Sequence, residues 1–575
     1  MILQALNAYY ERLKSDDDPV VPPLGFTWRP ISFVVVIDRN GSLIQVQDLR
    51  EESNRKVIAK QMIVPSLGRK KSSGVDPDFL WGPTGYVLGA DNSDRPERTA
   101  DKFKQLKELQ HQLGNGLVDE GMAAVLSFLD HWNPAEALKL PAWKEMAGTN
   151  VVFRLDTKLE YVHEASLIQD VWSNYYLEDD VGNTGMCLVS GEKVNISRLH
   201  PGIKGVGTAT AEGALVSFND DSSCSYGKEQ NFNAPVGKTA AFGYTTALNH
   251  LLRKDNRQRV KIGDAITVFW TARESPIEGF MGMILDPRED AGDLQPVRLF
   301  LEAVRNGKMP QDVGDPEVPF FILGLSPNAA RISVRFWHVS TVGDMAEKIG
   351  QHFRDLDIVR RYENDPEFPG IWHLLRQTAV QSKTENIPPM LAGVVMRSIL
   401  TGACYPQHLL SAVIGRIRAD HNTKGEIDIN YLRAAIIKAC LNRKFRLTRI
   451  NKEVTMSLDK ESTNIAYRLG RLFAVLEKAQ KDAIPGANTT IKDRFYGAAS
   501  ATPSVVFPQL LRLAQHHLQK AEYGGWTDKM IEEVMRGIEK FPAHLSLDDQ
   551  GMFAIGYYHQ RQAFYTKSEN KKEGE

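Results

Sequence analysis

Cysteine is scarce in this chain of 575 residues. The four cysteines, Cys187, Cys224, Cys404 and Cys440, stand far apart and form no CxxC pair. Structural zinc sites use such closely spaced pairs, and disulfide-stabilised scaffolds are dense in cysteine. The spacing therefore argues against both kinds of scaffold and favours a reducing compartment.

Long apolar runs and an excess of one charge are also missing. No run reaches the ~18 apolar residues of a membrane-spanning helix. Residues Met1–Leu13 have no basic region, long apolar core or small-residue cleavage site, which a signal peptide would need. We therefore expect a cytoplasmic protein. The formal net charge of -1 excludes a uniformly basic chain, so any nucleic-acid surface must be a local patch.

The known catalytic motifs are absent as well. The 14 histidines are scattered, with no HExxH helix, and there is no GxSxG elbow. Asp220 and Asp221 would suit a metal, but without a third acidic neighbour an Asx turn is the favoured interpretation. Gly237-Lys238-Thr239 ends like a P-loop, yet Phe232 stands where that loop needs its first glycine. We expect no enzyme activity, no metal and no cofactor.

The first part of the chain combines strands and helices. Ile31–Asp38 and Leu43–Leu49 flank the turn Arg39-Asn40-Gly41 and predict a β-hairpin. Phe320–Gly324 and Arg331–His338 predict a second strand pair, followed by a helix over 344–355. Residues 2–13 and 98–131 are expected to be helical, with a break near Gly114–Gly116. Further strands are expected at Val151–Leu155, Leu215–Phe218 and Ile266–Ala272.

From about Asp357 onward the apolar residues recur mostly at helical spacing. The helices expected there cover residues 370–383, 388–401, 406–419, 429–447, 461–482, 504–522, 526–540 and 548–565. The sequence therefore predicts an α+β fold of about three domains. These are a mixed N-terminal domain with short antiparallel sheets over residues 1–356, a helical region with a basic edge over 357–455, and a C-terminal helical bundle over 456–575.

The chain is organised around one stretch, Phe218–Leu252. Its first half is polar and rich in Gly and Asn, which predicts a loop. Its second half, from Ala240, is apolar at helical spacing and predicts the helix that holds this loop. Recognition residues often lie on such a loop. The candidates here are Tyr226, Gln230, Asn231, Asn233 and Lys238.

Two other segments concentrate positive charge. Between Asn54 and Lys71 there are six basic residues and no acidic one, and Tyr431–Lys452 holds seven Lys/Arg without Asp or Glu. Each is either a solvated surface or a contact to nucleic-acid phosphates, which Arg, Lys and Ser usually make. The candidates in the first segment and just after it are Arg69, Lys70, Lys71, Ser72 and Ser73. Those in and after the second are Arg443, Lys444, Arg446, Arg449, Arg468, Arg471 and Arg494.

Several long motifs resemble those of a single family. They are MILQALNAYYERL, FLWGPTGYVLG, SYGKEQNFNAPVGKTAAFGYTTALNHLL, FILGLSPNAARISVRFW, YRLGRLFAVLEKAQ and RFYGAASATPSVVFP. Together they span nearly the whole chain, which resembles the large subunit of the type I-C CRISPR surveillance complex (Cascade). Gly82-Pro83, Asn231 and Gly237-Lys238 depart from the usual residues of that family.

The resemblance implies a nucleic-acid-binding subunit that is not itself an enzyme. Such a complex carries a guide RNA along repeated backbone subunits, and base pairing reads the target. The large subunit lies at the 5′ region of the guide RNA and recognises the protospacer-adjacent motif (PAM) in double-stranded target DNA. It promotes duplex opening and R-loop formation, stabilises the displaced single strand and helps to recruit a helicase-nuclease. Small helical subunits complete the complex.

The resemblance also suggests a division of labour between the loops. Arg69, Lys70 and Lys71 are expected to hold phosphates. Gln230 or Asn233 is expected to contact bases or wedge the strands apart, because Asn and Gln suit the acceptors of the minor groove. The basic edge within Tyr431–Lys452, with the arginines that follow it, is expected to hold the displaced strand.

In this family the same gene often also encodes a small helical subunit. Met456 is either its internal start, which would give 120 residues, or an ordinary methionine of a linker. Two other functional classes stay open. A nuclease or NTPase of the same defence system would show metal-dependent or ATP-dependent activity. A protein-only helical scaffold would show no salt-dependent affinity for DNA, and the basic segments argue against it.

Overall fold

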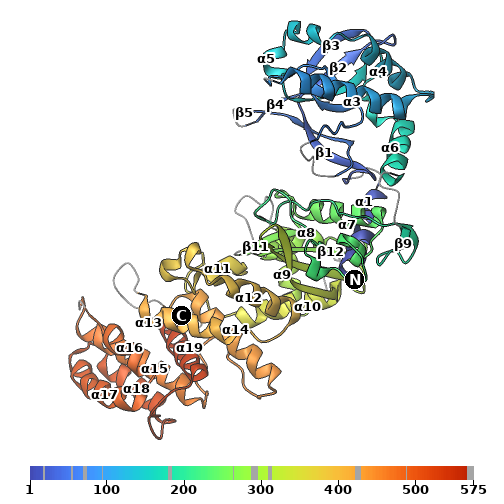
Figure 1. Ribbon diagram of the computed structural model, residues 1–575. Coiled ribbons are helices and arrows are strands. Elements are labelled where there is room, and N and C mark those ends of the chain that lie inside the picture. The colour runs from blue at the N-terminus through green and yellow to red at the C-terminus, as the bar shows by residue number, and fades with distance from the viewer. Residues whose placement is uncertain are drawn as a thin grey trace. The chain divides into compact units, whose positions relative to one another are not determined.

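The chain forms two compact units (Figure 1). The first comprises Met1–Lys254 with Pro327–Ser333, and the second Asp255–Ser326 with Val334–Glu575. The boundaries expected near residues 356 and 455 both fall inside the second unit. The computed structural model describes residues 1–16, 20–53, 56–68, 74–93, 95–178, 184–262, 265–285, 295–308, 314–420, 429–486 and 489–565.

The first unit is built on a four-stranded sheet with the strand order β3-β2-β8-β7. Strand β2 pairs antiparallel with β3, as a hairpin, and parallel with β8. Because Val34, Val35 and Val36 are β-branched and alternate between the two faces, β2 is buried on both sides. The strands are β2 (Phe33–Ile37), β3 (Leu43–Asp48), β7 (Trp81–Pro83) and β8 (Asn150–Leu155).

Different elements cover the two faces of this sheet. Phe33 and Val35 share one core with side chains from three helices, and Val34 and Val36 share another with a two-stranded ribbon. The helices are α3 (Pro96–Gly114), α4 (Glu120–His131) and α6 (Ser166–Glu178), and the ribbon is β1 (Phe26–Ile31) paired with β6 (Lys60–Pro65). The shorter elements are β4 (Glu51–Ser53), β5 (Lys56–Ile58), α2 (Thr84–Val87), η1 (Pro134–Lys139), α5 (Trp143–Met146), η2 (Val162–Glu164), β9 (Thr184–Met186) and β10 (Lys193–Asn195).

Two helices far apart in the sequence pack closely within the first unit. They are α1 (Ile2–Lys14) and α7 (Lys238–Leu251). Gly243 on α7 permits the approach, because a Cβ there would lie 2.3 Å from Asn7 Oδ1. Tyr10 meets Phe242 edge-on at a ring separation of 5.7 Å. This packing fixes α7, which carries the Phe218–Gly237 loop at its N-terminal end.

The second unit begins with an antiparallel sheet in the order β11-β12-β13-β14. Strand β12 is buried along its whole length. The strands are β11 (Arg259–Ile262), β12 (Ala265–Thr271), β13 (Pro319–Asn328) and β14 (Arg331–Thr341), and the helices that accompany them are α8 (Ile277–Leu285), α9 (Gln295–Arg305) and α10 (Val342–Leu356).

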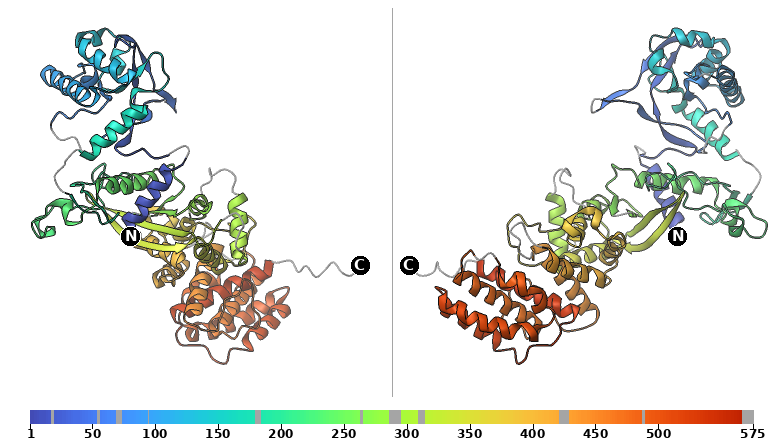
Figure 2. Two further views of the ribbon diagram at one scale, coloured as in Figure 1. Left: turned by 90° about the vertical axis from the view of Figure 1, so that its right-hand side faces the viewer. Right: turned by 60° about the vertical axis from the view of Figure 1, so that its left-hand side comes forward.

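Helices make up the rest of the second unit, and those from α15 to α19 lie side by side in both views of Figure 2. Helix α19 packs against α15 and also against α14. The helices are α11 (Ile371–Arg376), η6 (Val380–Ser382), η7 (Thr384–Asn386), α12 (Pro389–Thr401), α13 (Gln407–Ala419), α14 (Tyr431–Leu447), α15 (Ile465–Ala483), α16 (Ile491–Ala499), α17 (Pro503–Lys520), α18 (Gly524–Met535) and α19 (Leu547–Tyr565). None of the described helices is both long and apolar enough to cross a membrane.

The predicted α+β fold is confirmed, with mixed short sheets first and helices to the end. The hairpin β2–β3 and the strand pair β13–β14 lie where the alternating patterns predict them. The strand expected at Leu215–Phe218 is wrong. That segment runs as a loop, preceded by the isolated bridges of Gly213 with Ile203 and of Ala214 with Arg331, and no described strand pairs with it. Helices α6, α8, α9 and α16 were not expected from the sequence.

Candidate nucleic-acid interface

The loop Phe218–Gly237 is held together by the side chain of Asn233. The amide oxygen of Asn233 accepts a hydrogen bond from the Ser225 N–H at 2.9 Å. Its Nδ2 donates to the carbonyl oxygens of Lys228 and Gln230 at 3.0 and 2.9 Å. Asn233 thus uses both of its polar atoms within the loop. The contact of Asn233 with bases, or its role as a wedge, stays a prediction; in the structure its amide closes the loop internally.

The tip of this loop presents Tyr226. Its side chain is 98% exposed, the highest exposure among the large hydrophobic side chains that the structure describes. The backbone of Tyr226 lies in the left-handed region at φ +52°, followed by Gly227 at φ +68°. A non-glycine residue in this region is uncommon and needs its surroundings to hold it. The Asn233 hydrogen bonds supply that support, so the loop projects an aromatic ring into solvent on an ordered backbone.

The other loop candidates are more enclosed. Gln230 is half-buried with φ +47°, and its Oε1 accepts a hydrogen bond from Arg198 Nη1 at 3.0 Å. Asn231 is 2% exposed, so it lies inside the protein and does not face a ligand. Lys238 is half-buried, and its Nζ lies 3.4 Å from the carbonyl oxygens of Tyr176 and Leu177. Of the five candidates, Tyr226 is the one that projects fully.

The neighbours of this loop also bear on two motifs considered in the sequence. Gly237 precedes α7, but its N–H donates to Cys187 Sγ at 3.2 Å, so a phosphate would have to displace this bond. Asp220 forms an ion pair with Arg331 at 3.2 Å. Among the described residues there is no group of three or more side chains suited to hold a metal ion. The five candidates from Arg69 to Ser73 lie outside the described residues.

The basic edge expected on α14 does not form. Arg443 is 1% exposed, and its Nε donates to Asp355 Oδ2 at 3.0 Å. Arg446 binds the same carboxylate with both terminal nitrogens, each at 2.9 Å. Lys444 pairs with Asp548. The prediction of four aligned, exposed cations is wrong, because acidic residues distant in the sequence neutralise three of them; Arg449 is exposed.

The three arginines after α14 also have different surroundings. Arg471 is 2% exposed and bonds Gln560 at 3.1 Å and Glu533 at 3.2 Å, so the expectation that it contacts nucleic acid is wrong. Arg468 is half-buried and donates to the Ser462 carbonyl oxygen. Arg494 is exposed.

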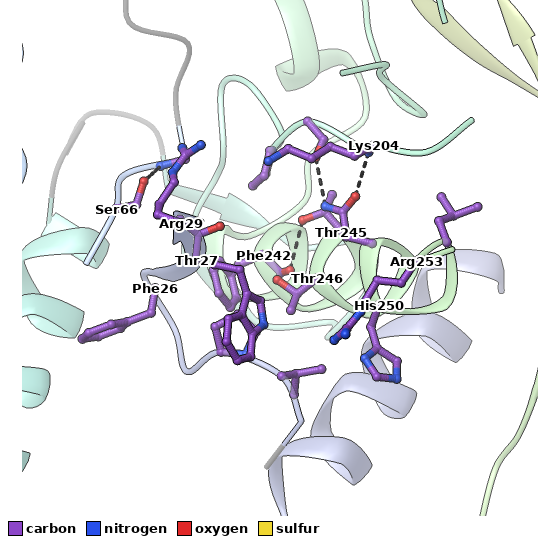
Figure 3. A pocket seen from close by; sticks show the side chains of 18 of the residues that line it. Phe26, Thr27, Arg29, Ser66, Lys204, Phe242, Thr245, Thr246, His250 and Arg253 are labelled. Carbon is purple, nitrogen blue, oxygen red and sulfur yellow. Dashed lines mark hydrogen bonds between the residues drawn. The ribbon is translucent and has the colours of Figure 1, made fainter. Parts of the chain in front are cut away.

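The structure adds a cavity to the first unit, shown in Figure 3. Its volume is about 520 Å³, within the range of about 300–1,000 Å³ that is usual for small-molecule sites. Its walls come from strand β1 of the ribbon, the loop after Pro201 and helix α7. Trp28, Arg29, Lys204, Phe242, Arg253 and Lys254 are among the lining residues. The sequence analysis did not predict this cavity, because its walls are far apart in the chain.

A further basic run, from Arg253 to Lys261, follows α7 and holds five Lys/Arg against one Asp. Helix α7 lies between the Phe218–Gly237 loop and the start of the run. Its 14 residues span about 21 Å, so Arg253 and Lys254 follow the helix at the end opposite to Gly237, where the loop ends.

The described residues thus form an α+β scaffold with a helical C-terminal part. This scaffold presents a loop with a projecting aromatic ring and a cavity with basic walls. The family is shown by comparison. The chain belongs to the Cas_Csd1 family of CRISPR-associated proteins, whose model matches residues 6–565. It is thus a Cascade large subunit of the type I-C system, which implies a complex with other Cas subunits and CRISPR RNA. No curated protein matches the chain.

The internal role of Asn233 leads to a direct prediction. We expect Asn233→Ala to speed hydrogen exchange of the Ser225 amide about tenfold or more, because three hydrogen bonds worth ~1 kcal/mol each are lost. Hydrogen exchange measured by mass spectrometry on peptides covering 222–236 would show it. Asn233→Asp is the matched control, since it keeps the acceptor for the Ser225 N–H. Unchanged exchange in Asn233→Ala would contradict the internal role.

Proposed function

We propose that this Cascade large subunit recognises the PAM in double-stranded DNA and starts duplex opening, with the Phe218–Gly237 loop as the element that enters the DNA. The observation that carries this proposal is Tyr226, a 98% exposed ring on a loop tied internally by Asn233. Proteins that open or kink DNA insert such side chains between base steps and pay the unstacking cost with new contacts. A pre-ordered loop lowers the entropy cost of that insertion.

In this proposal the roles of the loop residues differ from those expected from the sequence. Tyr226 stacks on the base pair at the point of opening. Gln230, half-buried behind it, is placed to meet a base edge if its bond to Arg198 is exchanged. Lys228, exposed beside Tyr226, contacts phosphate, as do the cations from Arg69 to Lys71. Asn233 holds the geometry that the others use.

The remaining steps of the family's function belong to the same proposal. The subunit contacts the 5′ region of the guide RNA, stabilises the displaced strand and helps to recruit the helicase-nuclease, without being an enzyme itself. For the displaced strand, Arg449 and Arg494 are exposed members of the seven cations predicted in the helical region, whereas the exposed Arg446 is paired with Asp355. The buried arginines Arg443 and Arg471 have no part in it.

The test is target binding by the reconstituted guide-RNA complex, with and without this subunit, across all variants of the flanking trinucleotide. We expect flank-dependent binding only with the subunit present. We expect Tyr226→Ala to weaken R-loop formation about tenfold or more, because one base–aromatic stack is worth ~1–3 kcal/mol. Tyr226→Phe keeps the ring and is expected to behave nearly as the wild type.

Two control variants distinguish recognition of the flanking bases from contact with the DNA phosphates. Lys228→Ala is expected to weaken binding to all flanks alike and to lower the salt dependence, since it removes a phosphate contact. Gln230→Ala is expected to flatten the flank preference. If the preference survives without the subunit, the PAM-reading proposal fails and the protein-only scaffold replaces it. If Tyr226→Ala opens target DNA as fast as the wild type, the loop is not the wedge.

A further inference from the structure

The cavity of Figure 3 combines an accessible indole ring with a strong excess of positive charge. Trp28 is 39% exposed on strand β1, although a tryptophan of a soluble protein is usually well buried. Four cations line the cavity: Arg29, Lys204, Arg253 and Lys254. Among its described lining residues, Glu212 is the single acidic one. The charges of the walls are therefore far from balanced.

The ion pair between Lys204 and Glu212 is weak. Lys204 Nζ lies 3.4 Å from Glu212 Oε1, and the Lys204 side chain is 52% exposed. Such a solvated pair contributes only ~0–1 kcal/mol, so an incoming anion can replace it. Arg29 is half-buried, and its Nε is buried without a hydrogen-bond partner among the described residues. Unmet donors of this kind favour a ligand that brings acceptor oxygens.

The two properties together select a class of ligand. A phosphate alone would make no use of an exposed indole ring, and an apolar ligand would make no use of four cations. A nucleotide uses both, because its base stacks on an aromatic face while its phosphates meet Arg and Lys. The volume of about 520 Å³ is sufficient for one nucleotide with its flanking phosphates and too small for a base-paired duplex.

We infer that this cavity captures one unpaired nucleotide of the nucleic acid, with its base against Trp28 and its phosphates on Arg29, Lys204 and Lys254. The inference rests on the proposed function in so far as the chain must bind nucleic acid. It assigns a second contact site, whose lining residues do not include Tyr226. Gly68, at the end of a described segment, lines the same cavity.

The probe for this site is adenosine 3′,5′-bisphosphate, which carries one base and both flanking phosphates. Isothermal titration with the full chain is expected to show binding at one site. We expect Trp28→Ala to weaken it about tenfold or more and Trp28→Phe to restore most of it, since Phe keeps an aromatic face. Arg29→Ala combined with Lys254→Ala is expected to weaken it by a similar factor. Lys158→Ala removes an exposed lysine of the same unit outside the cavity and should change nothing.

Two further titrations identify which nucleic acid supplies the nucleotide and whether its base contributes to binding. The deoxyribose form of the bisphosphate distinguishes the sources. A preference for ribose assigns the cavity to the guide RNA, a preference for deoxyribose assigns it to target DNA, and equal affinity means that the cavity takes a nucleotide of either kind. Each of these supports the inference. No binding to the wild type, or equal binding to Trp28→Ala, overturns it. Binding of inorganic phosphate as tight as that of the bisphosphate also overturns it, because the base would then contribute nothing.

The inference and the proposed function fail separately. Tyr226→Ala is expected to leave the bisphosphate affinity unchanged, because Tyr226 does not line the cavity. Trp28→Ala is expected to leave the flank preference of the reconstituted complex unchanged, while lowering its affinity for all targets alike. If the bisphosphate does not bind but flank-dependent opening persists, the cavity inference alone is wrong.

Discussion

Replacing Asp355 with alanine is expected to destabilise the second unit by about 3–5 kcal/mol, the cost of removing one partner from a buried charge cluster. The Asp355 side chain is 1% exposed, as is that of Arg443, whose guanidinium it binds. Arg446 approaches the same carboxylate from the partly exposed side. Without the carboxylate, the Arg443 charge would remain inside the protein with no counter-charge.

The surroundings of Arg443 show why it cannot escape to solvent. Its Nη1 donates to the Ser398 carbonyl oxygen at 2.8 Å, and its guanidinium lies 4.2 Å from the centre of the Tyr405 ring. Burial lowers the pKa of the neighbouring His352 to about 3, so this imidazole is neutral and supplies no charge. The free energy of unfolding from urea titration of the full chain would measure the loss.

A matched variant and the pH dependence of stability distinguish the loss of this buried charge pair from a general destabilisation of the second unit. Asp548→Ala removes a partly exposed ion pair with Lys444 and is expected to cost at most ~1 kcal/mol.

Burial alone would raise the pKa of Asp355, but the hydrogen bond with Arg446 and the charges of both arginines outweigh it and lower the pKa. The contribution of this carboxylate is therefore complete above about pH 4, the usual pKa of an unfolded Asp. It is lost as the pH falls through the lower folded-state pKa, so the gap between wild type and Asp355→Ala should narrow in acid. A loss below ~1 kcal/mol at pH 7 would contradict the role assigned to Asp355.

The second large effect is expected at the contact between α15 and α19, where Gly470→Ala should destabilise the second unit by about 2 kcal/mol or more. A Cβ on Gly470 would lie 2.0 Å from the Phe553 carbonyl oxygen, and one on Gly556 would lie 2.1 Å from that of Tyr467. The two helices thus meet backbone to backbone through one glycine on each side. Backbone atoms cannot turn aside as a flexible side chain can, so the helices would have to separate.

The control substitution is expected to change the stability of the protein in the opposite direction. Gly497 lies in helix α16 with nothing within 4 Å of the place of its Cβ. Gly497→Ala is expected to stabilise by up to about 1 kcal/mol, since alanine restricts the unfolded chain more than glycine does. Thermal unfolding of the three proteins would show the two shifts. Equal shifts for Gly470→Ala and Gly497→Ala would mean that the α15–α19 contact tolerates a Cβ.

The sequence alone predicted the strands β2, β3, β13 and β14 from their alternating pattern. It also predicted the helices after residue 357 from their periodicity, and the cysteine spacing argued against a cysteine-based scaffold. These features depend on residues close together in the chain, where side-chain period and turn residues act locally. The family could also be recognised from the sequence, because its motifs are continuous stretches of the chain. The loop ahead of α7 was also predicted correctly as a loop, from its Gly and Asn content.

What each polar residue does was decided by tertiary structure. Arg443 belonged to a run of cations without acidic residues, yet its partner Asp355 lies 88 positions earlier and draws it into the core. Asn233 has the chemistry of a base contact, but the fold of its own loop uses up its hydrogen bonds, and the projecting residue is Tyr226. The cavity with Trp28 exists only because strand β1 and helix α7, more than 200 residues apart, share one unit. Local pattern determined the elements and the family, whereas burial and partner choice, which depend on contacts between distant segments, determined which side chains remain available to a ligand.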